Sequence, residues 1–190
     1  YEMNGEPLPM LNGFPLRVIV PGYFGTYWVK HVHEITVIDE VLGNFWMNPA
    51  YRIADNDCGF VEPGTTPTKT IPIKKYNVRS FITNVQDGAT VKANEQSSLK
   101  GIAFDGGYGI TEVLISVDSG KTWLAANLGK DLGKYSFREW TTNPVNVKAG
   151  KYELKVRAVN RVGETQPLEA LWNPQGYMRN VVETTRVTAV

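Results

Sequence analysis

Strict alternation of apolar and charged residues over residues 151–158 is the pattern that most constrains the fold. The run at residues 151–160 reads KYELKVRAVN, and the apolar and charged side chains of its alternating part point to opposite faces of one β-strand. A shorter alternation at residues 112–117 precedes a turn at residues 118–121, which predicts a hairpin. A last β-rich segment covers residues 181–190, and no amphipathic helix is evident. Residues 69–190 are therefore expected to form an antiparallel sandwich of immunoglobulin-like type.

The first third of the chain has a different character. Residues 1–68 contain short apolar runs separated by Gly, Pro and Asn. The run LRVIV at residues 16–20 predicts a buried strand, and residues 31–40 are compatible with another. A Pro/Thr stretch at residues 62–68 marks the predicted domain boundary. Such a loop-rich segment buries too little apolar surface to offset its chain entropy, so we expect it to fold only against a further segment.

Composition narrows the possible partners. The 190 residues carry a formal net charge of +1 and are 42% hydrophobic, which is typical of a globular protein without an electrostatic footprint for nucleic acid or anionic membrane. No apolar run approaches the roughly 20 residues of a membrane helix. The chain opens on a polar segment without an initiating Met or a visible signal peptide, and we interpret it as a fragment or a processed product.

Two motifs invite a ligand-binding interpretation that we do not favour. His31 and His33 would lie on one face of a strand, but two ligands leave a zinc site incomplete unless carboxylates such as Glu34 or Asp39 join. Surface histidines are the favoured interpretation. The glycine-rich run at residues 105–109 lacks the Lys-Ser/Thr of a phosphate loop, so we interpret it as a turn.

Three residues of the loop-rich part have side chains suited to binding or catalysis. Arg17 interrupts an apolar run, where an unpaired buried charge is costly, so it must have a partner. Lys30 follows a loop containing Gly22 and Gly25, whose flexible backbone can approach a ligand closely. Tyr51 can donate a hydrogen bond without adding a charge. Taken alone, these residues are also typical of a loop-rich surface with ordinary charges.

Several blocks of sequence, spread over nearly the whole chain, resemble the sulfite oxidase family. They read YEMNGEPLP, GFPLR, VPG…WVK, FWMNPAYR, RSFITNVQDG, GIAFDGGYGITEVLISVDSGKTW and WNPQGYMRN. Within this family, the blocks are most similar to the bacterial periplasmic sulfite dehydrogenases, which pass electrons to a cytochrome c. The resemblance implies that residues 1–68 are the C-terminal part of a mixed α/β molybdopterin-binding domain. It implies that residues 69–190 are the immunoglobulin-like dimerisation domain, so that the chain is mainly β.

By this resemblance, residues near the start of the chain hold the cofactor. Arg17 and Lys30 match residues that bind the molybdopterin phosphate and pterin, a role that suits the bidentate fork of an arginine and the point charge of a lysine. Trp28 and Val29 occupy neighbouring positions, where main-chain groups could contact the pterin. Asn12 stands where animal relatives carry a histidine, and its amide can donate and accept but cannot become cationic.

The resemblance also implies a catalytic residue and a substrate pocket. Tyr51 matches the active-site tyrosine next to the oxo ligand of molybdenum, and Trp46 of the same block is expected to line the pocket. Gln175 occupies a position where animal sulfite oxidases carry an arginine of the anion pocket, in what we expect to be the C-terminal domain. Because Gln175 is neutral, Arg52 or Arg179 is expected to supply the charge.

Cys58 is not expected to ligate molybdenum. The family's ligand cysteine lies in the N-terminal half of the molybdenum domain, upstream of these residues, so we interpret Cys58 as a loop thiol. As the only cysteine, it also excludes an internal disulfide and a multi-cysteine zinc site.

The function implied by the resemblance is oxidation of sulfite to sulfate by a molybdenum–molybdopterin cofactor (Moco). Electrons would pass to a cytochrome c or a cytochrome subunit, so that haem c is carried only by a partner. The missing N-terminal half would be a further partner, a homodimer is possible, and the implied location is the periplasm. Two alternatives stay open: a related molybdopterin enzyme acting on nitrate or sulfane sulfur, and an immunoglobulin-like interaction module without activity on its own.

Overall fold

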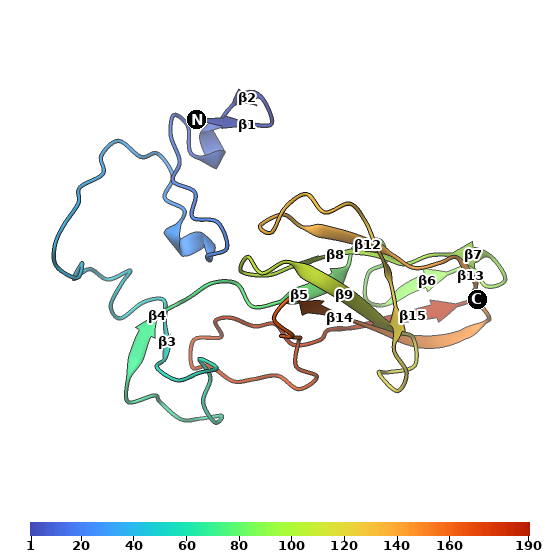
Figure 1. Ribbon diagram of the computed structural model, residues 1–190. Helices are drawn as coiled ribbons and strands as arrows, with labels where there is room; N and C mark the ends of the chain where they lie inside the picture. Colours follow the sequence, from blue (N-terminus) through green and yellow to red (C-terminus); the bar gives the residue numbers. More distant parts are fainter. The chain divides into compact units, whose positions relative to one another are not determined.

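The computed structural model describes all 190 residues and divides into two compact units. The first unit comprises Tyr1–Tyr76 and Trp172–Met178, and the second comprises Asn77–Leu171 and Arg179–Val190. Each unit can be followed separately in Figure 1. The division at Tyr76 differs from the boundary predicted at residue 68. The reason is a strand pair beyond the Pro/Thr stretch, in which β4 (Thr70–Pro72) joins β3 (Arg52–Ala54) of the first unit.

The second unit is a sandwich of two main sheets. The five-stranded sheet has the order β10-β9-β14-β15-β6, and the four-stranded sheet has the order β11-β12-β8-β5. All strand pairs in them are antiparallel except β15 with β6. The strands of the first sheet are β6 (Ala89–Val91), β9 (Ile110–Ser116), β10 (Leu124–Ala125), β14 (Gly150–Asn160) and β15 (Thr184–Ala189). The strands of the second sheet are β5 (Arg79–Ile82), β8 (Lys100–Phe104), β11 (Asn127–Leu128) and β12 (Arg138–Thr141).

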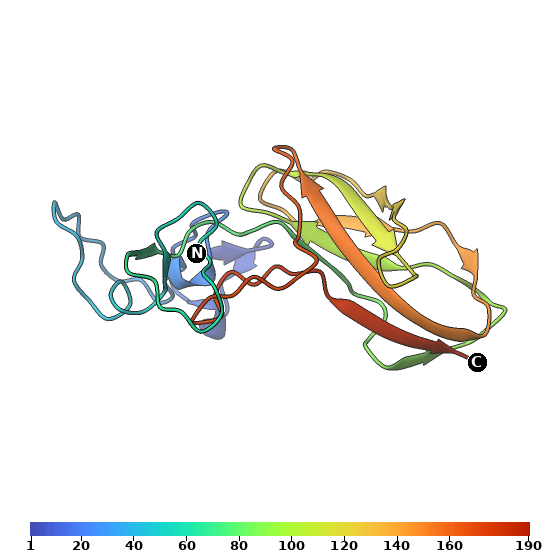
Figure 2. The same ribbon diagram turned by 90° about the horizontal axis from the view of Figure 1, so that it is seen from below.

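The alternating run of the sequence forms the longest strand, β14, at the centre of its sheet. It pairs with β9 on one side and β15 on the other, and Figure 2 shows the long β14 and β15 running side by side. Leu154, Val156 and Ala158 are buried, whereas Lys151 and Glu153 on the opposite face are exposed. The predicted strand and its two faces are therefore confirmed. A further small sheet joins β7 (Gln96–Ser97) and β13 (Val145–Asn146).

Trp140 on β12 is the largest side chain in the core of the sandwich. It is 1% exposed, and its indole Nε1 donates a hydrogen bond of 2.9 Å to Ser80 Oγ on β5. Ser80 Oγ in turn donates to the carbonyl oxygen of Ile102 over 2.9 Å. The ring packs directly against Gly101, where a Cβ atom would collide with the indole and with the carbonyl oxygen of Phe81. The core therefore depends on a glycine at this position.

Side-chain oxygens organise the two turns that flank β9. The buried carboxylate of Asp105 accepts hydrogen bonds from the amides of Gly107, Tyr108 and Gly109 over 2.9–3.3 Å. The glycine-rich run is thus a turn closed on its own aspartate, as predicted. After β9, Asp118 accepts hydrogen bonds from Ser116 Oγ at 2.7 Å and from Thr122. This turn leads into β10, which confirms the predicted hairpin.

The first unit has little regular structure. Its elements are β1 (Glu2–Met3), β2 (Glu6–Pro7), β3, β4 and two short 3-10 helices, η1 (Met10–Asn12) and η2 (Gly25–Tyr27). Neither 3-10 helix is long and apolar enough to cross a membrane. The unit contains no α-helix, which agrees with a chain that is mainly β. A small core gathers Ile53, Phe60, Ile73 and Met178.

Two strands predicted in the first unit are wrong. Residues 16–20 form two backbone hydrogen bonds to the segment that follows them, Val18 N to Val29 O and Val32 N to Leu16 O, but they are not assigned as a strand. Ile19 is 51% exposed, so the expected burial is also missing. Residues 31–40 are irregular, because His31 has a left-handed φ of 54° and the apolar side chains that follow find no surface to pack on.

Candidate functional site

Arg17 lies against the indole of Trp28 in the first unit. Its guanidinium carbon is 5.5 Å from the ring centroid, and Nη1 donates a hydrogen bond of 3.2 Å to the carbonyl oxygen of Asn12. Trp28 is fixed by its own hydrogen bond of 2.9 Å from Nε1 to the carbonyl oxygen of Val20. Arg17 Nε is buried and has no hydrogen-bond partner. A partner for Arg17 was predicted, and the structure provides an aromatic face and a carbonyl rather than an acid.

Lys30 contacts the same part of the chain near Asn12. Its Nζ donates a hydrogen bond of 2.6 Å to the carbonyl oxygen of Leu11. The lysine stem passes so close to Gly13, which has a φ of 113°, that a Cβ atom there would meet Lys30 Cβ at 3.1 Å. Val29 accepts its hydrogen bond from Val18 through its carbonyl oxygen. The side-chain amide of Asn12 is 3.8 Å from the sulfur of Met3, so the contact of Asn12 with Arg17 is made by its backbone.

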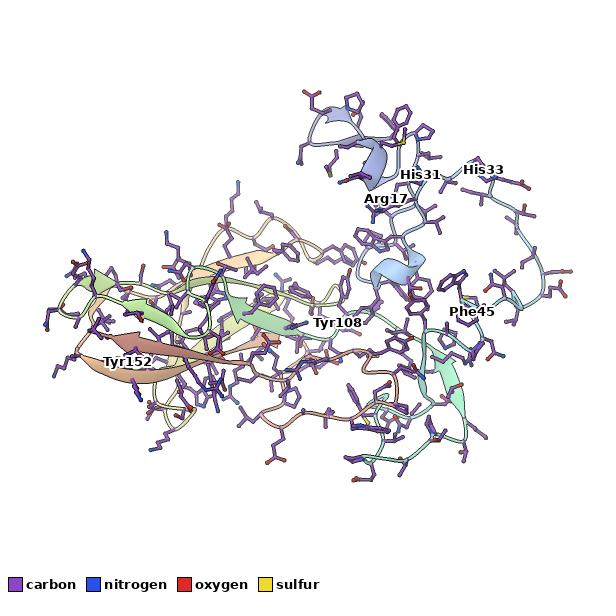
Figure 3. All side chains as sticks on the ribbon, turned by 180° about the vertical axis from the view of Figure 1, so that it is seen from behind. Arg17, His31, His33, Phe45, Tyr108 and Tyr152 are labelled. Atoms are coloured by element: carbon purple, nitrogen blue, oxygen red, sulfur yellow. The ribbon has the colours of Figure 1, made fainter.

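These contacts bring five predicted cofactor residues into one cluster, which we call the cation loop: Asn12, Arg17, Trp28, Val29 and Lys30. Neither cation of the loop forms an ion pair with a carboxylate, and both instead hold backbone carbonyl oxygens. Unpaired cations with a guanidinium N–H still free are suited to a phosphate. The cluster therefore fits the anionic end of a molybdopterin cofactor. Figure 3 shows Arg17 and His31 near each other in the first unit.

The described residues offer no ligand set for a metal ion. No group of three or more His, Cys, Asp or Glu side chains is placed to hold one. His31 Nδ1 lies 2.7 Å from the carbonyl oxygen of Phe14, and His33 is exposed farther along the chain (Figure 3). Cys58 is an exposed loop thiol, 3.6 Å from Asn56 Oδ1. The zinc interpretation of the two histidines is thus not supported.

Tyr51 has a left-handed backbone with a φ of 50°, which is uncommon for a residue other than glycine. Its carbonyl oxygen accepts a hydrogen bond of 2.8 Å from Ile73 N. Its ring stacks with Trp46, at a centroid distance of 6.0 Å, and with Tyr177, at 5.5 Å. The hydroxyl of Tyr51 has no hydrogen-bond partner in the chain, so it is free to donate to a ligand. A constrained aromatic residue with a free hydroxyl is consistent with the predicted catalytic role.

Arg52 has a structural use that the sequence did not reveal. Its guanidinium donates to Thr70 Oγ1 at 2.8 Å, to the carbonyl oxygen of Thr70 at 2.5 Å and to that of Met47 at 2.9 Å. Nε, Nη1 and Nη2 are all engaged, and they fasten β3 to β4 and to the loop that carries Trp46. A substrate anion would have to compete with these bonds, which weakens the predicted role of Arg52 in the substrate pocket.

Gln175 belongs to the first unit, although the sequence suggested the C-terminal domain. Its backbone amide donates a hydrogen bond of 3.0 Å to Asn173 Oδ1, and its side chain is exposed. Asn173 is 6% exposed and also donates from Nδ2 to the carbonyl oxygen of Gly59 over 3.2 Å. Arg179, the alternative charge donor, lies in the second unit and is 4.0 Å from Glu183.

Tyr177 is the site residue that sequence reasoning missed. Its ring stacks on Tyr51, and its hydroxyl oxygen accepts a hydrogen bond of 3.4 Å from Tyr51 N. The only available signal was its position in the block WNPQGYMRN, two residues after Gln175.

Two domain families match the chain. The second match begins before the division at Tyr76 and includes Trp172–Met178 of the first unit, so its limits follow the sequence order rather than the two compact units. Residues 1–46 match the oxidoreductase molybdopterin binding domain, and residues 70–189 match the Mo-co oxidoreductase dimerisation domain. The structure is similar to that of the sulfane dehydrogenase SoxCD from Paracoccus pantotrophus, with a TM-score of 0.79 at 22% identity over 95% of this chain and 46% of that one. At this identity the likeness concerns the fold alone.

Three enzymes are similar to this chain over part of their own length. Human mitochondrial sulfite oxidase is 34% identical over 95% of this chain and 34% of its own length. Sulfite oxidase of Arabidopsis thaliana is 33% identical over 94% of the chain and 48% of its own length. Inducible nitrate reductase [NADH] 2 of Glycine max is 29% identical over 95% of the chain and 22% of its own length. The chain therefore spans less than half the length of these relatives.

The two domain matches define a class, the oxidoreductases with a molybdenum cofactor. Within that class, the chain belongs to the sulfite oxidase family.

Proposed function

We propose that this chain is the C-terminal portion of an enzyme that oxidises sulfite to sulfate with a molybdenum cofactor. The cation loop is the observation that carries the proposal, because Arg17 and Lys30 have no carboxylate partners and a guanidinium N–H of Arg17 is buried and unsatisfied. Such a group gains a charge-assisted hydrogen bond when a phosphate binds. The similarity to animal and plant sulfite oxidases supports the substrate.

Each residue of the candidate site would have a role that suits the chemistry of its side chain. Arg17 and Lys30 would hold the phosphate of the cofactor, with Trp28 keeping the guanidinium in place. Tyr51 would donate a neutral hydrogen bond from its hydroxyl to an oxygen of the substrate, which orients that oxygen without adding charge. Gln175 would contribute a neutral donor. The bound cofactor would supply the two-electron chemistry, and the segment carrying its metal ligand would come from the N-terminal half of the domain.

Nitrate and sulfane sulfur are the rival substrates, since a nitrate reductase and a sulfane dehydrogenase are among the similar proteins. The test is steady-state turnover of the complete enzyme with sulfite, nitrate and thiosulfate. We expect sulfite to give the highest kcat/KM. Tyr51→Phe should lower it about 10²-fold, which is within the usual range for losing a group that transfers or positions a proton. Tyr152→Phe is a matched control, because Tyr152 lies on β14 and its hydroxyl bonds Lys148 O. Preferred turnover of nitrate or thiosulfate would contradict the proposal.

We further propose that a cytochrome c accepts the electrons in the periplasm and that two copies of the chain pair through the second unit. The match to a dimerisation domain supports the pairing. So does an apolar cavity of about 390 Å³ in the second unit, beside Leu124 and Val145, which are 71% and 59% exposed. Light scattering of Leu124→Glu should show a shift toward monomer. An unchanged mass would contradict pairing at this face.

A further inference from the structure

The ring of Tyr51 stacks with two other aromatic rings. The planes of Trp46 and Tyr177 are each inclined by 27° to the plane of Tyr51, at centroid distances of 6.0 and 5.5 Å. Aromatic pairs in offset stacks at such distances attract each other, and contact with two rings restricts rotation of the side chain. The direction of the Tyr51 hydroxyl is therefore set by its two neighbours.

Tyr177 also contacts the backbone of Tyr51. The amide of Tyr51 donates a long hydrogen bond of 3.4 Å to the hydroxyl oxygen of Tyr177, while its carbonyl oxygen accepts from Ile73 N at 2.8 Å. These bonds hold both polar groups of a residue whose φ of 50° is unfavourable without support. Trp46 makes no such backbone contact, and it is 60% exposed. Of the two neighbours, Tyr177 is therefore the stronger restraint.

The turn that carries Tyr177 is itself anchored. Gly176 N donates to the carbonyl oxygen of Asn173 over 2.9 Å, and Gly176 has the left-handed φ of 70° that this turn needs. The side chain of Asn173 is buried and bonds the carbonyl oxygen of Gly59. On the other side of Tyr177, Met178 is 9% exposed in the core of the first unit. Tyr177, which restrains Tyr51, is therefore itself held in place by its neighbours in the chain.

We propose that Tyr177 is a positioning residue for Tyr51, acting through its ring and its hydroxyl to aim the Tyr51 hydroxyl at the substrate. The inference rests on the proposed function, since it requires Tyr51 to contact the substrate. Tyr177 itself does not contact the reacting atoms. Its effect on turnover passes entirely through Tyr51.

A double-mutant cycle in the complete enzyme tests the proposal. Four proteins are compared for kcat and KM with sulfite: the parent, Tyr177→Leu, Tyr51→Phe and the double variant, with bound pterin measured in each. We expect Tyr177→Leu to lower kcat about 10- to 100-fold in the parent, because small misplacements of a reacting group are costly. The same change should have less than a twofold effect in the Tyr51→Phe background. A merely structural role would lower kcat equally in both backgrounds, and that result would overturn the proposal.

The conservative variant keeps the proposal testable if Tyr177→Leu does not fold. Tyr177→Phe retains the stack and loses only the oxygen that accepts from Tyr51 N, so we expect kcat to fall by about threefold with pterin content and KM unchanged. If kcat is unchanged in both Tyr177 variants while Tyr51→Phe is impaired, the positioning role of Tyr177 is refuted and the proposed function stands. Full activity of Tyr51→Phe would refute the proposed function itself.

Discussion

The hydroxyl of Tyr27 donates a hydrogen bond of 2.5 Å to the carbonyl oxygen of Ile73. Ile73 N donates in turn to the carbonyl oxygen of Tyr51, so one residue of the core ties the two halves of the site together. Tyr27 immediately precedes Trp28, whose ring supports Arg17. The cation loop and Tyr51 thus share a connection through Ile73.

Removing this connection should loosen the site. Tyr27→Phe deletes one donor and leaves a carbonyl oxygen without its partner, so we expect a loss of about 1–2 kcal/mol in the stability of the first unit.

Burial, together with the nearby Tyr23, raises the pKa of Tyr27 above 10.0. The stability that comes from this raised pKa is present below pH 10 and is lost as the pH rises through the pKa of the folded state. Between neutral pH and strong alkali, the parent should therefore lose more stability than Tyr27→Phe does. Hydrogen exchange at Trp28 and Tyr51 measures the first effect, and alkaline denaturation the second. Equal exchange in both proteins would contradict the connection.

Neutralising the cation loop should weaken cofactor binding without unfolding the chain. Arg17→Met and Lys30→Met each remove a charge that would face the phosphate, at a cost of about 1.5–3 kcal/mol, or roughly 10- to 100-fold in affinity. Pterin content after dialysis measures the change. Lys151→Met, an exposed lysine of β14, is the control and should retain the parent's pterin. Full pterin occupancy in both loop variants after dialysis would show that the cofactor is held elsewhere.

Gly101 should not tolerate a side chain. In Gly101→Ala the new Cβ would collide with the indole of Trp140 and with the carbonyl oxygen of Phe81, so two strands of the sandwich must separate. We expect a loss of about 3 kcal/mol or more, at the upper end of the range for overpacked cores. Denaturant unfolding followed by tryptophan fluorescence measures it. Gly43→Ala is the control, because nothing lies within 4 Å of its Cβ position. An unchanged midpoint for Gly101→Ala would mean that the core is packed differently.

The turn after β9 should make stability sensitive to acid. Hydrogen bonds from the backbone and hydroxyl of Thr122, and from Ser116, lower the pKa of Asp118 to about 2 from the ordinary 3.8. A lowered pKa gives stability that is present above pH 3.8 and is lost as the pH falls toward 2. Asp118→Asn should therefore be less stable than the parent at pH 6 and converge with it near pH 2. Urea midpoints between pH 6 and pH 2 check this, with the exposed Asp57→Asn as control. A constant difference across this range would contradict the assignment.

The sandwich could be predicted because its signal is local. Alternation over residues 151–158 places one face of β14 in the core whatever its neighbours are. The polar groups of the turns beside β9 find hydrogen-bond partners within a few residues of the chain. The first unit offers no such signal. The run at residues 16–20 has strand-like composition, but Ile19 lies at the surface, so burial does not enforce a strand there.

The site was predictable only in part, because the sequence reveals contacts between nearby residues more readily than contacts between distant ones. Arg17, Trp28 and Lys30 are close in sequence and do lie together. Contacts across long separations were missed, because Trp172–Met178 joins the first unit and brings Tyr177 onto Tyr51. Arg52 was judged by its charge, yet its guanidinium is used by Thr70 and Met47. The cytochrome acceptor and the periplasmic location stay predictions.

Native mass spectrometry of the purified protein, with molybdenum counted in the same sample, tests whether this chain helps to hold a molybdenum cofactor. We expect one molybdopterin and one molybdenum for each copy of this chain, together with the segment that supplies the metal ligand. It also predicts that Arg17→Met lowers the pterin count while the mass of the polypeptide complex stays the same. A folded complex that contains this chain and the metal-ligand segment, yet carries neither pterin nor molybdenum, would contradict it.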